Sequence, residues 1–113
     1  MVSDPVEHVR LRLIELIEKG CIAVPIEVEM PHKWWFGTVI DPRTGQCFTY
    51  RGAWDFIAEK LREGCKLQEK PLRKPPTDMG YVLLVNTEQR DIYIKLQLGY
   101  DRVIGRSFHY SGD

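Results

Sequence analysis

The last third of the chain constrains the fold more than any other segment. Residues 81–86, YVLLVN, form a nearly continuous apolar run, which is typical of a central strand covered on both faces. Residues 91–98, DIYIKLQL, alternate between apolar and polar side chains, as a strand with one buried face does. Residues 103–110, VIGRSFHY, follow after a short turn. The three runs therefore predict a three-stranded antiparallel meander.

Two amphipathic helices are expected ahead of this meander. Asp4 is suited to cap a helix and Pro5 to occupy its first position, so a helix is predicted over about 5–19. Gly20 is a natural end for it. Apolar residues at helical spacing predict a second helix over about 52–62.

These elements predict an α+β fold, in which an antiparallel sheet ending in the C-terminal meander packs with two helices. A chain of 113 residues is expected to form one domain, 1–113. Residues 22–29 are expected to form a strand that lies at an edge of the sheet or contains a break, because Pro25 lacks an N–H group. A hairpin is expected over 34–50, and the proline-containing connector 65–79 is expected to be mostly irregular.

The composition excludes several classes of protein. The chain has no apolar run of about 18 residues, so no membrane-spanning segment is expected. Its three cysteines are too far apart for a disulfide framework or a zinc site, and they are expected to be buried free thiols. No phosphate loop or dinucleotide fingerprint is present. We therefore expect a cytoplasmic protein that holds no metal and no cofactor.

Charge is distributed unevenly along a chain whose formal net charge is zero. The stretch 60–74 contains six Lys or Arg residues and two Glu residues. Such a run attracts phosphate groups over a short range, although solvated helix ends often carry one too.

The length of the last turn decides which side chains share a face of the meander. A three-residue loop over 99–101 pairs Leu98 with Arg102 and leaves Arg106 on the apolar face. We prefer this register, because it sorts polar from apolar residues better. In this register one polar face carries Tyr93, Lys95, Ser107 and His109. Tyr93 lies opposite Ser107, and Asp91 lies opposite His109.

A four-residue loop over 99–102 is the alternative. It shifts the pairing by one residue and places Arg106 and Phe108 beside Tyr93 and Lys95. In that register the final histidine turns away from the tyrosine.

A face that carries Tyr, Lys, Ser and His suits RNA cleavage without a metal ion. That reaction deprotonates the ribose 2′-hydroxyl, stabilises a pentavalent phosphate and protonates the leaving oxygen. Histidine titrates near neutral pH and can act as the base or the acid. Lysine or arginine can neutralise the developing charge, and tyrosine can donate a proton or stack on a base.

The C-terminal segment resembles a known family. The runs D-I-Y-I-K-L at 91–96 and V-I-G-R-S-F-H at 103–109 are similar to the end of the MqsR-type (motility quorum-sensing regulator) toxins. The order of elements, a first helix ending near Gly20 and a second helix before a basic connector, is also similar. The resemblance implies a RelE-like fold and an endoribonuclease toxin that is neutralised by a cognate antitoxin.

The resemblance also implies roles for individual residues. It places the sheet tyrosine of the family at Tyr93, its basic residue at His109, and its lysine after the second helix at Lys66. Lys95 or Arg106 is expected to stabilise the phosphate. The residues expected to bind the RNA are Lys66, Lys70, Arg73, Lys74 and Ser107.

Other functions fit the same sequence. One alternative is a non-catalytic module that binds protein or nucleic acid through its basic connector and through one exposed member of the Trp34–Trp35 pair. The neutral net charge favours this alternative, because dedicated RNA-binding proteins are usually more basic. Another is a structural subunit whose polar sheet face is buried against a second chain. The Arg51–Gly52 pair either binds an anion at the start of the second helix or forms a plain turn.

Overall fold

The computed structural model describes residues 5–24, 33–72 and 79–112, and the predicted α+β class is confirmed there. The described helices are α1 (Pro5–Glu18), the 3-10 helix η1 (Phe36–Thr38) and α2 (Tyr50–Arg62). The described strands are β1 (Ile22–Ala23), β2 (Lys33–Trp34), β3 (Leu67–Pro71), β4 (Met79–Val85), β5 (Ile92–Leu98) and β6 (Val103–Tyr110).

The described strands form one sheet in the order β1-β6-β5-β4-β3. Strands β3, β4, β5 and β6 are antiparallel to one another in that order, so the predicted C-terminal meander is confirmed. Strands β1 and β2 instead run parallel to β6, one after the other along its length, which makes the sheet as a whole mixed. The edge position expected for residues 22–29 holds for β1, while residues 25–29 lie outside the described part.

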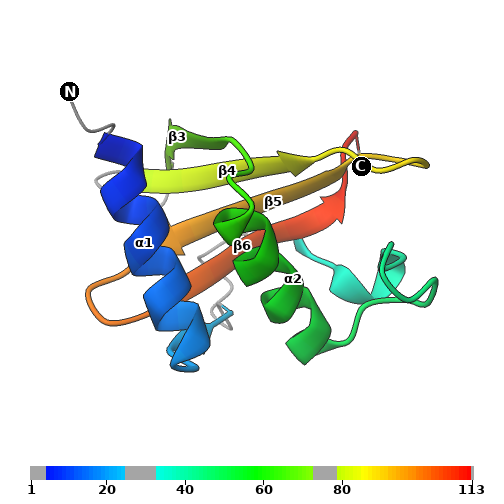
Figure 1. Cartoon of the computed structure of the whole chain (residues 1–113), viewed down its shortest axis with the longest axis horizontal. Helices are drawn as coiled ribbons and strands as arrows, with labels where there is room; N and C mark the ends of the chain where they lie inside the picture. Colours follow the sequence, from blue (N-terminus) through cyan, green and yellow to red (C-terminus); the bar gives the residue numbers. More distant parts are fainter. Residues whose placement is uncertain (1–4, 25–32, 73–78, 113) are drawn as a thin grey trace.

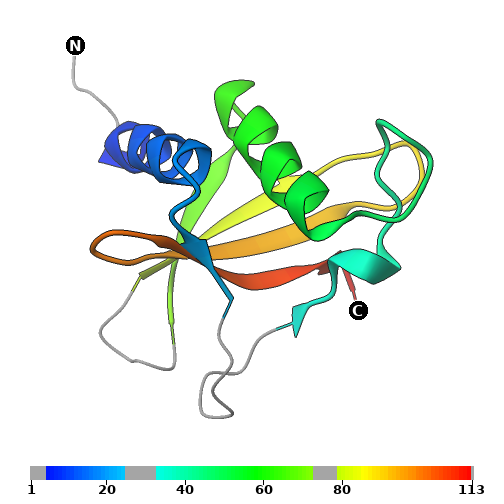
Figure 2. The same cartoon turned by 90° about the horizontal axis from the view of Figure 1, so that it is seen from below.

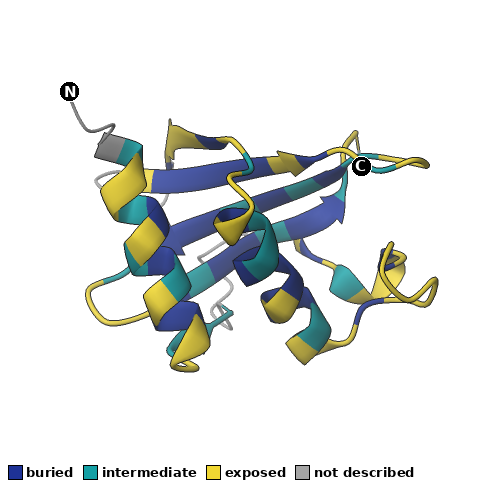
Figure 3. Ribbon diagram, in the orientation of Figure 1, coloured by how far each residue is buried: buried dark blue, intermediate teal, exposed yellow. Residues whose placement is uncertain are grey.

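Both α-helices cover the same face of the sheet (Figures 1 and 2). Their buried residues point toward the strands, and their exposed residues point outward (Figure 3). Helix α2 begins two residues earlier than expected. Its cap is Thr49, whose hydroxyl oxygen accepts a hydrogen bond from the Gly52 N–H at 2.9 Å.

An aromatic cluster forms the core between α2 and β6. The ring of Phe108, which is fully buried, lies 4.9 Å from the ring of Phe48 and 5.5 Å from that of Trp34. Trp34 also packs against Trp54 of α2, with 4.9 Å between the ring centroids. Trp34 lies directly over Gly105, where an added Cβ would come within 2.6 Å of its ring. This packing holds the two-residue strand β2 against β6.

The loop between β5 and β6 has four residues, so the three-residue loop that we preferred is wrong. Leu98 pairs with Val103, and the Gly99 N–H donates a hydrogen bond to the Arg102 carbonyl at 2.9 Å. The physical reason is burial: Val103 is fully buried on the helix side, where the shorter loop would have placed the charged Arg102.

A β-bulge then restores the arrangement that the longer loop would have destroyed. Lys95 pairs with Ser107 while Leu96 pairs with Gly105, so Arg106 is one extra residue in β6. A bulge of this kind shifts the register by one residue and so exchanges the faces of the side chains that follow.

Beyond the bulge, His109 lies opposite Tyr93, where we expected Ser107. Tyr93, Lys95, Ser107 and His109 therefore share one face, as predicted, but with different partners. Arg106 also departs from the prediction. It points to the polar face, where its Nη1 donates a hydrogen bond to Gln97 Oε1 at 2.7 Å.

Three local predictions need correction. The hairpin expected over 34–50 is reduced to one bridge, between Ile40 and Cys47, around a turn that begins at Asp41. The connector contains strand β3 rather than being mostly irregular. The three cysteines are free, as expected, but Cys47 is exposed and the other two are only partly buried.

Candidate functional site

Most of the predicted site residues lie on the face of the sheet that carries neither α-helix, on the side away from α1 and α2 in Figure 2. We call this the helix-free face. It is formed by the strand positions that alternate with the core positions, together with the bulged residue. Its residues in the described strands are Ala23, Lys33, Gln68, Lys70, Gly80, Val82, Leu84, Tyr93, Lys95, Gln97, Ile104, Arg106, Ser107 and His109.

Two cross-strand pairs bring the predicted catalytic residues together. Tyr93 lies opposite His109, and Lys95 lies opposite Ser107. Side chains at directly opposite positions of an antiparallel pair are in contact range. The rings of Tyr93 and His109 are stacked, with 5.3 Å between their centroids and 27° between their planes.

His109 is held in one orientation by its surroundings. Its residue surface is only 6% exposed, and the ring of Trp35 lies 5.7 Å away, tilted by 48°. Its Nδ1 is 2.7 Å from the Tyr110 carbonyl oxygen. A carbonyl oxygen can only accept a hydrogen bond, so Nδ1 carries a proton. In a neutral ring Nε2 is then the nitrogen that can accept a hydrogen bond.

The described strands place several cationic side chains on the helix-free face. The face positions of the described strands carry no Asp or Glu. They carry four cationic side chains, on four different strands: Lys33, Lys70, Lys95 and Arg106. Arg106 is 5% exposed, and its guanidinium is oriented by the hydrogen bond that it donates to the buried side chain of Gln97. Within the described strands, the Lys, Arg, Asp and Glu positions of this face are therefore all cationic.

One end of the face is covered. Leu72 is 3% exposed and packs over Gly80, where an added Cβ would meet Leu72 Cδ2 at 2.9 Å and Lys95 Cε at 3.2 Å. The more accessible end carries Trp35, which is 44% exposed, and Leu84, which is 47% exposed. A ligand of the helix-free face would therefore enter beside Trp35 and Tyr93.

The predicted RNA-binding residues of the connector are only partly brought to this face. Lys70 is exposed and lies on it, in strand β3. Lys66 is exposed in the short turn between α2 and β3. Arg73 and Lys74 lie outside the described residues, so their predicted role remains a prediction.

Sequence reasoning missed two features of this site. Gln97 was not singled out, although alternation in residues 91–98 already placed it on the face of Tyr93 and Lys95. The position of Lys33 on this face was not predicted either. This lysine reaches the face because β2 runs parallel to β6, and its ammonium lies 5.5 Å from the centroid of the Trp35 ring. No local pattern marks such a parallel pairing.

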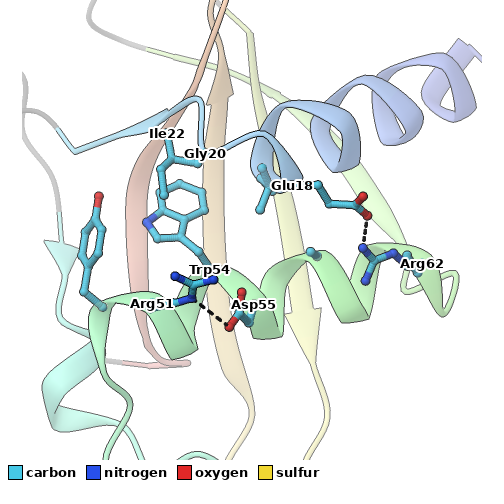
Figure 4. Close-up of a pocket in the computed structure, with 10 residues that line it drawn as sticks. Glu18, Gly20, Ile22, Arg51, Trp54, Asp55 and Arg62 are labelled. Atoms are coloured by element: carbon cyan, nitrogen blue, oxygen red, sulfur yellow. Dashed lines mark hydrogen bonds and ion pairs between the residues drawn. The ribbon is translucent and has the colours of Figure 1, made fainter.

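A separate pocket lies on the other side of the molecule, between the end of α1 and helix α2 (Figure 4). Its volume is about 570 Å³, with Trp54 and Ile22 in its wall. Its charged residues are paired with one another: Arg51 with Asp55 at 3.9 Å, and Arg62 with Glu18. Together with the Thr49 cap, these pairs favour a plain helix start over an anion site at Arg51–Gly52.

Within the described residues, no group of three or more His, Cys, Asp or Glu side chains is placed to hold a metal ion. No helix in the described ranges is long and apolar enough to cross a membrane. No protein-family model, curated protein or solved structure shows a significant match to the chain.

Proposed function

We propose that the chain is a metal-independent endoribonuclease of the toxin class that its resemblance to the MqsR-type toxins implies. Its substrate is RNA, its place of action is the cytoplasm, and a cognate antitoxin neutralises it. The observation that supports this most is the stacked pair of Tyr93 and His109 on the helix-free face. A titratable imidazole beside cationic side chains is what cleavage next to a 2′-hydroxyl requires.

In the proposed reaction, His109 Nε2 takes the proton of the ribose 2′-hydroxyl. The 2′-oxygen attacks the adjacent phosphorus, and the bond from phosphorus to the 5′-oxygen breaks. The leaving oxygen takes a proton from water, and the hydroxide so formed takes the first proton back from His109. The products are a 2′,3′-cyclic phosphate and a 5′-hydroxyl. Lys95 or Arg106 stabilises the pentavalent phosphate. Tyr93 positions the base or the 2′-hydroxyl, and Ser107 binds the substrate beside Lys95.

The remaining basic residues hold the RNA backbone in this proposal. Lys70 lies on the helix-free face, and Lys66 is exposed near its β3 edge. Arg73 and Lys74 continue the same basic run in the sequence. Contacts of this kind weaken as the salt concentration rises, so RNA binding should fall steeply with salt.

The test is RNA cleavage by the purified protein in the presence of EDTA. We expect fragments that end in a 2′,3′-cyclic phosphate, and no cleavage where the scissile nucleotide carries a 2′-deoxyribose. Tyr93→Phe should slow cleavage, because its hydroxyl can no longer contact the ribose. Absence of cleavage by the wild-type protein, or cleavage at the 2′-deoxy position, would refute the proposal.

A non-catalytic binding module is the second candidate. The observation that favours it is the burial of His109, which is 6% exposed between Trp35 and Tyr93, as a packed aromatic residue would be. This candidate predicts no RNA cleavage at all, with ligand binding retained in His109→Ala.

A further inference from the structure

An exposed tryptophan beside His109 has no part in the chemistry proposed above. Trp35 is 44% exposed, whereas the other two tryptophans of the chain, Trp34 and Trp54, are 7% and 2% exposed. The backbone N–H of Trp35 donates a hydrogen bond to the Phe108 carbonyl at 3.0 Å. Since Phe108 is fully buried, the backbone of Trp35 is fixed to the core strand β6. A large apolar ring is thus held rigidly at the surface.

Trp35 extends the aromatic stack of the candidate site. Its ring lies 5.7 Å from that of His109, which in turn lies 5.3 Å from that of Tyr93. The ammonium of Lys33 lies 5.5 Å from the centroid of the Trp35 ring. An exposed aromatic ring beside a cation is the usual arrangement for holding an unpaired nucleotide, because the ring stacks on the base and the cation attracts the phosphate.

We propose that Trp35 stacks on an unpaired base of single-stranded RNA and so positions the adjacent nucleotide at His109. The role of the adjacent nucleotide rests on the proposed function, whereas the stacking itself does not. The accessible charges of the face favour this ligand: Lys33 and Lys70 are exposed, Lys95 is partly exposed, and the face positions of the described strands carry no carboxylate. A polyanion complements such a surface better than an ordinary, mixed-charge protein surface does.

Tryptophan fluorescence makes the stacking directly measurable. Because Trp34 and Trp54 are buried, Trp35 is the tryptophan that a bound base can contact. The probe is a single-stranded 2′-O-methyl RNA oligonucleotide, which lacks the free hydroxyl and so cannot be cleaved by the proposed reaction. We expect it to quench the emission of the full-length wild-type protein in a saturable titration.

Variants assign the quenching to one residue. Trp35→Ala should weaken binding of the oligonucleotide by about 5- to 100-fold, the range expected for the loss of one stacked base. Trp35→Phe should lose the quenching but keep part of the affinity, measured by anisotropy of a labelled oligonucleotide. The control is Tyr100→Ala, since Tyr100 is 98% exposed in the turn at the far end of β5 and should not contribute.

The outcomes separate this inference from the proposed function. RNA cleavage by a Trp35→Ala protein with unchanged KM and unchanged oligonucleotide affinity would overturn the stacking role and leave the nuclease proposal standing. Quenching and a Trp35-dependent affinity without any RNA cleavage would support the stacking role and refute the nuclease. Absence of oligonucleotide binding would overturn the inference. So would an emission that changes on dilution of the protein alone, which would indicate that a second copy covers Trp35.

Discussion

Gly105 shows at the scale of one residue how the core positions the candidate site. It lies beside the bulge at Arg106, and a Cβ added there would come within 2.6–2.8 Å of three ring atoms of the buried Trp34. The close approach of Trp34 to β6 therefore requires a residue without a side chain. The same packing fixes the backbone that leads to Trp35.

We predict that Gly105→Ala lowers the free energy of unfolding by about 1–3 kcal/mol, as overpacking of a filled core does. The measurement is urea unfolding followed by tryptophan fluorescence. Gly37→Ala is a matched control, because a Cβ at Gly37 would meet nothing within 4 Å. Equal losses of stability in the two variants would contradict this account of the contact.

The candidate site could be predicted in part from single residues. Alternation in residues 91–98 identified Tyr93 and Lys95 as neighbours on a polar face, and the final strand contributed Ser107 and His109 to it. Sequence reasoning left open which member of the Trp34–Trp35 pair is exposed. That depends on the parallel pairing of β2 with β6, which joins segments about 70 residues apart and leaves no local signal.

At the scale of elements, the meander and both helices could be predicted because each has its own periodicity. The bulge could not. Its presence depends on the four-residue loop, which buries Val103, and on the need to return Phe108 to the core beyond it. Both are packing requirements that no run of residues within β6 reveals. The preferred loop length was wrong for this reason, although Tyr93, Lys95, Ser107 and His109 do share one face as predicted.

The turn that begins at Asp41 supports a prediction about acid stability. Burial disfavours the charged form of Asp41, but hydrogen bonds from the side chain and backbone of Arg43, together with its charge, outweigh burial and hold the pKa of this carboxyl below its ordinary value. A carboxyl whose pKa is lower in the folded state stabilises the fold above the pKa of the unfolded chain, about 3.9. This stabilisation is lost as the pH falls through the folded-state pKa.

We therefore expect Asp41→Asn to be less stable than the wild type at pH 7 and to approach it in stability at about pH 2–3. Urea unfolding at a series of pH values measures the difference. Asp55→Asn, which changes an exposed carboxylate on α2, serves as the control. A difference between wild type and Asp41→Asn that is constant across the whole pH range would show that the charge of Asp41 is not what stabilises the turn.

At the scale of the whole molecule, the sheet has two faces that differ in composition. One packs against α1 and α2 and contains the aromatic core. The other gathers cations from four strands around the Tyr93–His109 stack. Composition alone concealed this, because a net charge of zero averages the basic face with the acidic residues elsewhere. The α+β class followed from the sequence, whereas the charged face required the register of all the strands.

The central claim is that the helix-free face cleaves RNA through His109, and the most direct measurement is the rate of RNA cleavage in EDTA by two histidine variants. His109→Gln removes the titratable ring from the face, while His8→Gln removes an exposed histidine from α1. We predict that His109→Gln slows cleavage by about 10²- to 10⁴-fold, the usual contribution of a general acid or base, and that His8→Gln cleaves at the wild-type rate. Cleavage by a folded His109→Gln protein at the wild-type rate would contradict the claim.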